Sequence, residues 1–144
     1  DRERVRQLGH VEEMRRIRPE HPKAPSILVG DLNIAPLEHD VWGHKELLKV
    51  VSHTPIETSG FEAMRKDAGW IDLMRQFTPE PEKLYTWWSY RAADWEASNR
   101  GRRLDHVWSS PDLSPRLQGI EIIKAARGWD KPSDHVPVIA TFAL

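Results

Sequence analysis

Three short groups of polar residues adjoin apolar runs in this sequence, and each contains side chains that can bind a metal ion or move a proton. They are Gly30-Asp31-Leu32-Asn33, Arg103-Leu104-Asp105-His106 and Ser133-Asp134-His135. The first follows the apolar run 26–29, and the last precedes the apolar run 136–142. Carboxylate, amide and imidazole groups at the ends of three apolar segments indicate one shared site for divalent-metal chemistry on a phosphate group.

Asp31 and Asn33 are two positions apart, so in an extended segment their side chains would face the same side. A carboxylate is a hard ligand for Mg²⁺ or Mn²⁺, or a base for a water molecule. A neutral amide can orient that water or donate to a developing oxyanion. The alternative is an ordinary turn after a strand, where Asp and Asn are both favoured.

His135 can donate to a phosphate oxygen or bind a metal ion, and a carboxylate partner would fix its tautomer and favour its charged form. Asp105 is the candidate for that partner. The competing interpretations are a capped turn at Ser133–His135 and a salt bridge from Asp105 to Arg102 or Arg103.

Aromatic residues and arginines alternate in 87–91 and 99–103. Such segments suit a nucleic-acid backbone, because rings stack on bases or sugars and guanidinium groups bind phosphates. The alternative is a half-buried strand followed by a solvated basic loop. The other histidines show no useful spacing and are interpreted as surface or structural residues; they are His10, His21, His39, His44, His53 and His106.

The composition indicates one ordinary globular domain. The chain has 144 residues, of which 39% are hydrophobic and 30% charged, and a net charge of −1. It has no cysteine, which excludes disulfides and thiolate metal sites. No apolar stretch is long enough to span a membrane, and no signal peptide opens the sequence, so we expect a cytoplasmic protein without a membrane partner.

The apolar periodicity predicts helices early in the chain and strands late, which favours an α/β or α+β class. Val5, Leu8, Val11, Met14 and Ile17 predict an amphipathic helix over 2–18. Further helices are expected over 41–51 and 60–68, a short helix or turn over 70–73, and a loop over 91–101. Strands are expected over 26–29, 85–88, 104–109, 120–124 and 136–142.

Taken together, these motifs resemble the exonuclease III family of the endonuclease/exonuclease/phosphatase superfamily. The resemblance rests on 30–33, 85–91, 99–105 and 133–135, in the family's order and rough spacing. It implies the second half of a four-layer α/β/β/α sandwich of the DNase I-like kind, with a mixed or antiparallel sheet and flanking helices. Residues 1–144 would then be a single catalytic-domain fragment whose first half is absent.

The resemblance also implies a Mg²⁺-dependent DNA repair nuclease, with Mn²⁺ as an alternative ion, that cuts double-stranded DNA 5′ to abasic sites and degrades 3′ ends. The catalytic residues would be Asp31, Asn33, Asp105 and His135. The metal site would use Asp31, Asn33, Asp134 and His135. The DNA contacts would be Trp87, Arg91, Asn99, Arg100 and Leu104, with Trp87 and Leu104 bordering a pocket for the base-free sugar.

The sequence departs from the family pattern because the first half of the domain has no counterpart in it. That half supplies a metal-binding Glu, an Asn and a Tyr in the family, so we expect weaker Mg²⁺ binding and little activity of the chain alone. We also expect an apolar sheet face that needs this half as its partner. Two other functions compete: a phosphatase for small phosphoesters, and a truncated domain without catalysis.

Overall fold

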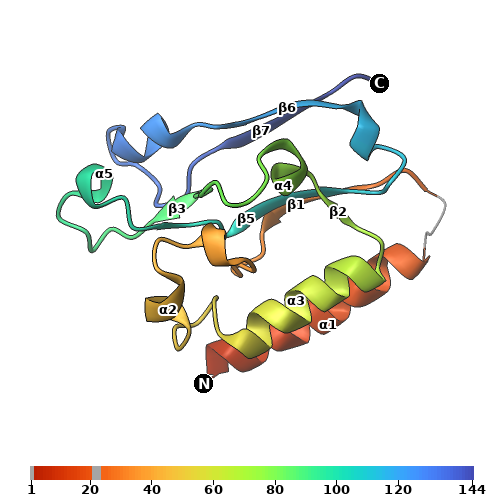
Figure 1. Ribbon diagram of the computed structural model, residues 1–144, viewed down its shortest axis with the longest axis horizontal. Coiled ribbons are helices and arrows are strands. Elements are labelled where there is room, and N and C mark those ends of the chain that lie inside the picture. The colour runs from red at the N-terminus through yellow and green to blue at the C-terminus, as the bar shows by residue number, and fades with distance from the viewer. Residues whose placement is uncertain (1, 21–23) are drawn as a thin grey trace.

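The computed structural model describes residues 2–20 and 24–144, and its elements form layers (Figure 1). The helices are α1 (Arg2–Glu20), α2 (His44–Leu47), α3 (Pro55–Asp67), α4 (Leu73–Phe77) and α5 (Trp95–Ser98), with 3₁₀ turns η1 (Glu38–Asp40), η2 (Ser114–Arg116) and η3 (Lys124–Gly128). The strands are β1 (Ile27–Asp31), β2 (Ile71–Asp72), β3 (Trp87–Trp88), β4 (Gly101–Arg102), β5 (Asp105–Ser109), β6 (Leu117–Ile122) and β7 (Val138–Phe142).

The central sheet has the antiparallel order β1-β5-β2 and separates two layers. Helices α1 and α3 lie side by side beneath it, and the antiparallel pair β6–β7 lies above it (Figure 1). Neighbouring residues of β5 therefore face opposite layers. Trp108 packs against Phe61 of α3, whereas Val107 packs in the cluster that includes residues of β6 and β7.

An apolar groove of about 530 Å³ opens between the central sheet and β7. Ile27 and Val29 of β1 line one side of it, and Val138 and Phe142 of β7 line the other. β1 is an edge strand, and its Ile27 and Val29 are 48% and 64% exposed. The expected exposed apolar face is therefore present at this groove.

The first helix forms as expected, but its buried face is narrower than the sequence suggested. Helix α1 buries Gln7, Val11 and Met14, which are spaced i, i+4, i+7 and form one stripe. Val5 and Ile17 are 66% and 49% exposed, because the core that includes α3 packs only against Val11 and Met14 in the middle of the apolar face of α1.

Several other boundaries differ from the sequence predictions. The helix expected over 60–68 begins earlier, at Pro55, because Pro is favoured in a first helical turn. The region 41–51 contains only the short α2, and the expected loop 91–101 contains α5, whose N-terminus is capped by the Asp94 side chain.

The region 70–73 forms strand β2 and the start of α4, which Asp72 caps by accepting from the Arg75 N–H. The strand expected over 85–88 narrows to β3. The strand expected over 120–124 shifts to Leu117–Ile122, because Lys124 already begins η3. Among the helices of the described chain, none is long and apolar enough to cross a membrane.

Candidate active site

Two carboxylates meet at one edge of the central sheet. Asp31 ends β1 and Asp105 begins β5, and the antiparallel register places the two residues directly opposite each other. Residues opposite each other in such a pair point to the same face. Gly30, just before Asp31, has a φ of +145°, a conformation that side chains disfavour, so glycine is required at this point of the strand.

His135 completes this group from the segment before β7. Its Nδ1 lies 2.8 Å from Asp105 Oδ2, and its Nε2 lies 3.6 Å from Asp31 Oδ2. One ligand atom from each of the three residues lies within 4.8 Å of the others. The expected pair of His135 and Asp105 is therefore confirmed, and the three side chains form a cluster that a metal ion could occupy.

Asp105 is held by Thr86 rather than by an arginine. The Thr86 hydroxyl donates to Asp105 Oδ2 at 2.6 Å and accepts from the backbone N–H groups of Leu104 and Asp105 at 3.1 Å. The same carboxylate oxygen accepts from His135, so Asp105 orients the ring through its Nδ1–H. The alternative of a salt bridge from Asp105 to Arg102 or Arg103 is wrong.

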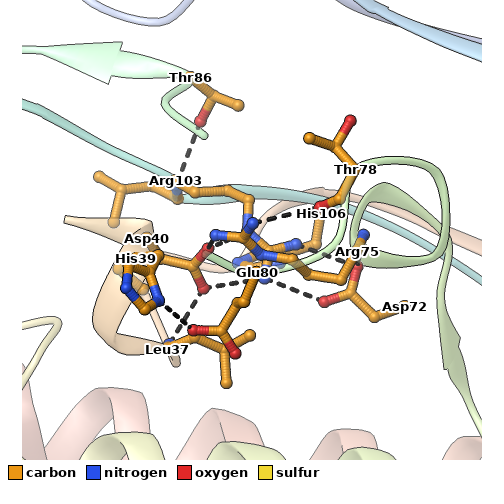
Figure 2. Close-up of polar contacts among 12 residues, drawn as sticks. Leu37, His39, Asp40, Asp72, Arg75, Thr78, Glu80, Thr86, Arg103 and His106 are labelled. Carbon is orange, nitrogen blue, oxygen red and sulfur yellow. Dashed lines mark hydrogen bonds and ion pairs between the residues drawn. The ribbon is translucent and has the colours of Figure 1, made fainter. Parts of the chain in front are cut away.

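Arg103 is instead fully buried and joins its own segment to those of Asp40 and Asp72 (Figure 2). It donates from Nε and Nη2 to the two carboxylate oxygens of Asp40 at 2.8 and 2.9 Å. It donates from Nη1 and Nη2 to the two oxygens of Asp72 at 3.0 and 2.9 Å. Arg75 adds a contact to Asp40 at 2.6 Å. This network fixes the chain immediately before Asp105.

Asn33 reaches the site by a turn, not by strand alternation. Its φ is +54°, and its backbone N–H donates to Asp31 Oδ1 at 2.9 Å. The argument that an extended segment places Asp31 and Asn33 on one side is therefore wrong, because β1 ends at Asp31. Asn33 tolerates this left-handed conformation better than most residues. Ser52 Oγ lies 3.5 Å from its Oδ1, and Gln7 donates to its backbone carbonyl.

The charges of the cluster perturb one another. Burial raises the pKa of the Asp31 carboxyl above its ordinary value, and the nearby Asp105 adds to the rise while His135 opposes it. The hydrogen bond to Asp105 raises the pKa of the His135 ring, against the opposing effect of burial. Proton affinity at both groups is therefore shifted upward, as at sites that transfer protons.

Asp134 belongs to the wall next to the cluster. Its Oδ2 accepts from Trp87 Nε1 at 3.0 Å, and its backbone carbonyl accepts from the Trp88 N–H. It is not among the three residues whose ligand atoms converge. Together Asp31, Asp105 and Asp134 outnumber the single imidazole, and this surplus of negative charge fits a divalent cation.

The remaining expected DNA contacts lie around the aromatic residues. Arg91, Arg100 and Trp87 line a cavity with Asp134. Asn99 accepts from Trp88 Nε1 at 3.0 Å and ends α5 with a φ of +47°. Leu104 is 4% exposed and packs in the core beside Trp87.

Sequence reasoning missed the residues that support the site from a distance. No sequence pattern predicts that Thr86 holds Asp105; the one indication is its position just before two tryptophans in a strand-like run. His44 Nδ1 and His53 Nε2 lie 2.8 Å apart and join the start of α2 to the segment before α3. Only the folded chain brings these groups together.

Comparison with known proteins identifies the family of this chain. The model of the Endonuclease/Exonuclease/phosphatase family matches residues 3–135. Exodeoxyribonuclease III of Haemophilus influenzae is 32% identical over 130 residues, covering 85% of this chain and 48% of that protein. The DNA repair nuclease APEX1 of Danio rerio is 34% identical over 122 residues, covering 85% of this chain and 37% of that protein. The chain thus spans about half or less of these relatives.

Solved structures give the same result. An AP endonuclease from Archaeoglobus fulgidus superposes on 100% of this chain and 56% of its own, with a TM-score of 0.93 and 24% identity, which shows the fold. The 3′ phosphatase NExo from Neisseria, bound to a product DNA hairpin, is 31% identical with a TM-score of 0.81, over 89% of this chain and 49% of its own. The expected mixed α/β class, matching about half of a DNase I-like fold, is confirmed. On these grounds, the chain belongs to the Endonuclease/Exonuclease/phosphatase family.

Proposed function

We propose that this chain carries the catalytic residues of a divalent-metal-dependent DNA nuclease that cuts the backbone 5′ to abasic sites and degrades 3′ ends. The observation that supports this most is the convergence of Asp31, Asp105 and His135 within 4.8 Å at one sheet edge. The relatives named above include an exodeoxyribonuclease and a DNA repair nuclease, and one solved neighbour holds a DNA product. Trp87 and the arginines beside the cluster provide a surface that suits a DNA strand.

In the proposed reaction, the Asp31 carboxylate takes a proton from a water molecule, whose oxygen forms a bond to phosphorus. The bond from phosphorus to the leaving 3′ oxygen breaks, and that oxygen takes a proton from solvent. The raised pKa of Asp31 makes it a stronger base than an ordinary carboxylate. The Asn33 amide holds the water beside it.

His135 contacts the scissile phosphate through Nε2, since its Nδ1 is occupied by Asp105. The raised pKa of the ring increases the share of imidazolium near neutral pH. An imidazolium donates to a phosphate oxygen and disperses the negative charge that gathers on the phosphate as the bonds exchange. Asp105 orients the ring and stabilises its charge.

The donor set fits Mg²⁺ or Mn²⁺, because it is rich in carboxylates and carries surplus negative charge. Asp31, Asn33 and Asp134 would hold the ion, while Nε2 of His135 is left for the phosphate. A bound ion would supply charge neutralisation at the phosphate. The residues of this chain alone offer few oxygen ligands, so we expect the ion to bind weakly.

We also propose that a polypeptide corresponding to the remaining half of the relatives completes the domain. The exposed Ile27 and Val29 on the edge strand β1 support this, because they leave apolar surface uncovered at the groove. Such a polypeptide would bury Ile27 and Val29 and add ligands to the metal site. The chain with its domain completed is therefore the form we expect to be active.

The test is a nicking assay on a duplex oligonucleotide with one abasic site, with Mg²⁺ and then with EDTA. The chain is assayed alone and with the complementary half-domain added. Nicking that needs Mg²⁺ and disappears in Asp31→Asn supports the proposal. Release of phosphate from small phosphoesters without nicking would instead indicate a phosphatase. Silence of both mixtures, with folding verified by circular dichroism, would leave a non-catalytic domain.

A further inference from the structure

Two residues with left-handed backbone conformations meet beside Asp31. Asn33 has a φ of +54°, Ser52 has a φ of +83°, and the Ser52 hydroxyl donates to Asn33 Oδ1 at 3.5 Å. Within the described chain this is the one hydrogen bond to the Asn33 side chain, since the other contacts of Asn33 use its backbone. Asn33 and Asp31 line one cleft of about 440 Å³ against α1, and Ser52 lies outside that lining. Any effect of Ser52 on the cleft therefore passes through Asn33.

Serine is an unusual residue for the backbone conformation at position 52. A φ of +83° is disfavoured by a side chain, whereas glycine adopts it without strain. Ser52 is 3% exposed, and its hydroxyl has one hydrogen-bond partner among the described residues, the Asn33 amide. Strained backbone conformations are concentrated at functional sites. The contact with Asn33 is thus what a serine provides here and a glycine would not.

Glu57 supports Ser52 in this conformation. Its carboxylate is fully buried in the first turn of α3, where the helix N-terminus favours a negative charge. Its Oε1 and Oε2 accept from the Ser52 backbone N–H at 3.0 and 3.2 Å, and Oε1 also accepts from the Thr54 hydroxyl at 2.6 Å. No salt bridge of the described residues includes Glu57, so its hydrogen bonds serve the segment that carries Ser52.

The segment that carries Ser52 is also joined to the chain that follows Asn33. The Ser52 carbonyl accepts from the Ala35 N–H at 2.9 Å. His53 Nδ1 lies 2.7 Å from the Ala35 carbonyl, and burial lowers the pKa of this ring, so the neutral ring donates from Nδ1. These contacts hold the loop before α3 against the turn at Asn33 and fix the two side chains relative to each other.

We infer that Ser52 is a positioning residue for the proposed reaction, whose hydroxyl holds the Asn33 amide in its working orientation beside Asp31. The inference rests on the proposed function, in which the Asn33 amide holds the attacking water. Oδ1 has two lone pairs, so the contact with Ser52 leaves one for a bound ion and leaves the Nδ2 hydrogens for the water. Glu57 acts one step further away, because it fixes Ser52. An amide that turns away would slow the reaction without weakening DNA binding.

The decisive variants are Ser52→Gly and Ser52→Ala, which remove the same hydroxyl but differ in backbone strain. Glycine relieves the left-handed conformation and alanine retains its strain, so Ser52→Gly should have the higher urea midpoint. The completed domain is assayed by nicking of the abasic duplex at saturating Mg²⁺. Both variants should lower kcat about tenfold and leave KM within about twofold of wild type. A merely structural role would make the loss of activity follow the loss of stability.

Asn33→Ala tests whether Ser52 acts through the Asn33 amide. In that background, Ser52→Gly should lower kcat no further, because the group that the hydroxyl orients has been removed. Ser114→Gly is the matched control. It removes a hydroxyl that donates to the Pro111 carbonyl at 3.2 Å, in η2, which follows the end of β5 opposite Asp105. It should nick with the kcat of wild type.

A second measurement needs no catalysis. The Asn33 side-chain N–H₂ signals of the ¹⁵N-labelled chain are followed by NMR in EDTA, and their ¹H–¹⁵N NOE reports motion on the picosecond to nanosecond scale. In wild type the NOE should approach the values of the backbone, because the amide is held. In Ser52→Gly and Ser52→Ala it should fall, because the amide then rotates more freely.

Wild-type kcat in both Ser52 variants would overturn the inference, and so would an Asn33 amide equally rigid with and without the hydroxyl. A loss in Ser52→Ala that is absent in Ser52→Gly would also overturn it, because strain and not the hydroxyl would then be the cause. So would a further loss of kcat from Ser52→Gly in the Asn33→Ala background. If the wild type does not nick, the proposed function fails, and the NMR measurement still decides whether Ser52 orients Asn33.

Discussion

Lowering the pH from about 7 to about 5 should destabilise this protein through His106, a buried histidine next to Asp105 in β5. The ring is 1% exposed and packs near Phe61 and Trp108. Its Nε2–H donates to the Ile34 carbonyl at 2.8 Å, while Nδ1 is buried and has no partner in the described chain. Protonation would place a second N–H in apolar surroundings, near the positive Arg103.

Burial, aided by Arg103, lowers the pKa of His106 from 6.5 to about 4. The unfolded chain therefore binds a proton at a higher pH than the folded chain does. The stability that the neutral ring preserves is present above pH 6.5 and is lost as the pH falls toward 4. The gap corresponds to about 3 kcal/mol in full, of which about 2 kcal/mol is lost by about pH 5.

The assay is urea unfolding of wild type and His106→Gln across this pH range. Glutamine cannot titrate, so its unfolding free energy should fall by about 2 kcal/mol less than that of the wild type. Asp72, whose pKa Arg103 lowers despite its burial, loses its contribution to stability only as the pH falls through about 3.8, below the range of this assay. Parallel curves for the two proteins would refute the reasoning, because they would show that His106 takes no proton on unfolding.

Other substitutions test the site and its support. In the domain completed by the other half, Asp31→Asn should lower the nicking rate about 10²-fold or more with DNA affinity nearly unchanged; a wild-type rate would remove Asp31 from the mechanism. His135→Ala should stay impaired at saturating Mg²⁺, and recovery in excess metal would make His135 a metal ligand instead. Trp87→Ala should reduce cutting at abasic sites more than digestion of 3′ ends, and equal losses would count against a sugar pocket beside that ring. Arg103→Met should cost about 3–5 kcal/mol in urea unfolding, since it removes the arginine partner of the buried Asp72 and leaves Asp40 with Arg75 alone, whereas the exposed Arg116→Met should cost under about 0.5 kcal/mol.

The convergence of Asp31, Asp105 and His135 could be predicted because these residues lie at or near strand ends. Asp31 follows an apolar run and Asp105 precedes another, and antiparallel pairing of those strands brings their opposite ends together. His135 could be paired with Asp105 from the chemistry of the two groups alone. The local sequence pattern and the chemistry of the side chains indicated the same site, so the convergence of these residues could be predicted from the sequence.

Asn33 shows where that kind of reasoning fails. Strand alternation predicted that Asn33 lies close to Asp31. The two residues are close, but the cause is a left-handed turn at Asn33, closed by a hydrogen bond from its backbone N–H to the Asp31 carboxylate. The sequence favours such a turn only weakly, through the tolerance of Asn for positive φ. The ion pairs of Arg103 could not be predicted for a different reason. Its partners Asp40 and Asp72 are 63 and 31 positions away in the sequence, and no local pattern indicates such distant contacts.

The run Ile27–Val29 is more apolar than its burial in this chain requires. A continuous apolar run, without alternation, is typical of a strand buried on both faces. Here Leu28 packs on the core beneath the sheet, but Ile27 and Val29 on the other face remain 48% and 64% exposed, although β7 lies across the groove. A polar residue at either position would cost this chain little, and the half-domain proposed above would explain the apolar run by burying it. The same edge strand carries Asp31, so a polypeptide that covered it would bury Ile27 and Val29 and also enclose the cluster of Asp31, Asp105 and His135.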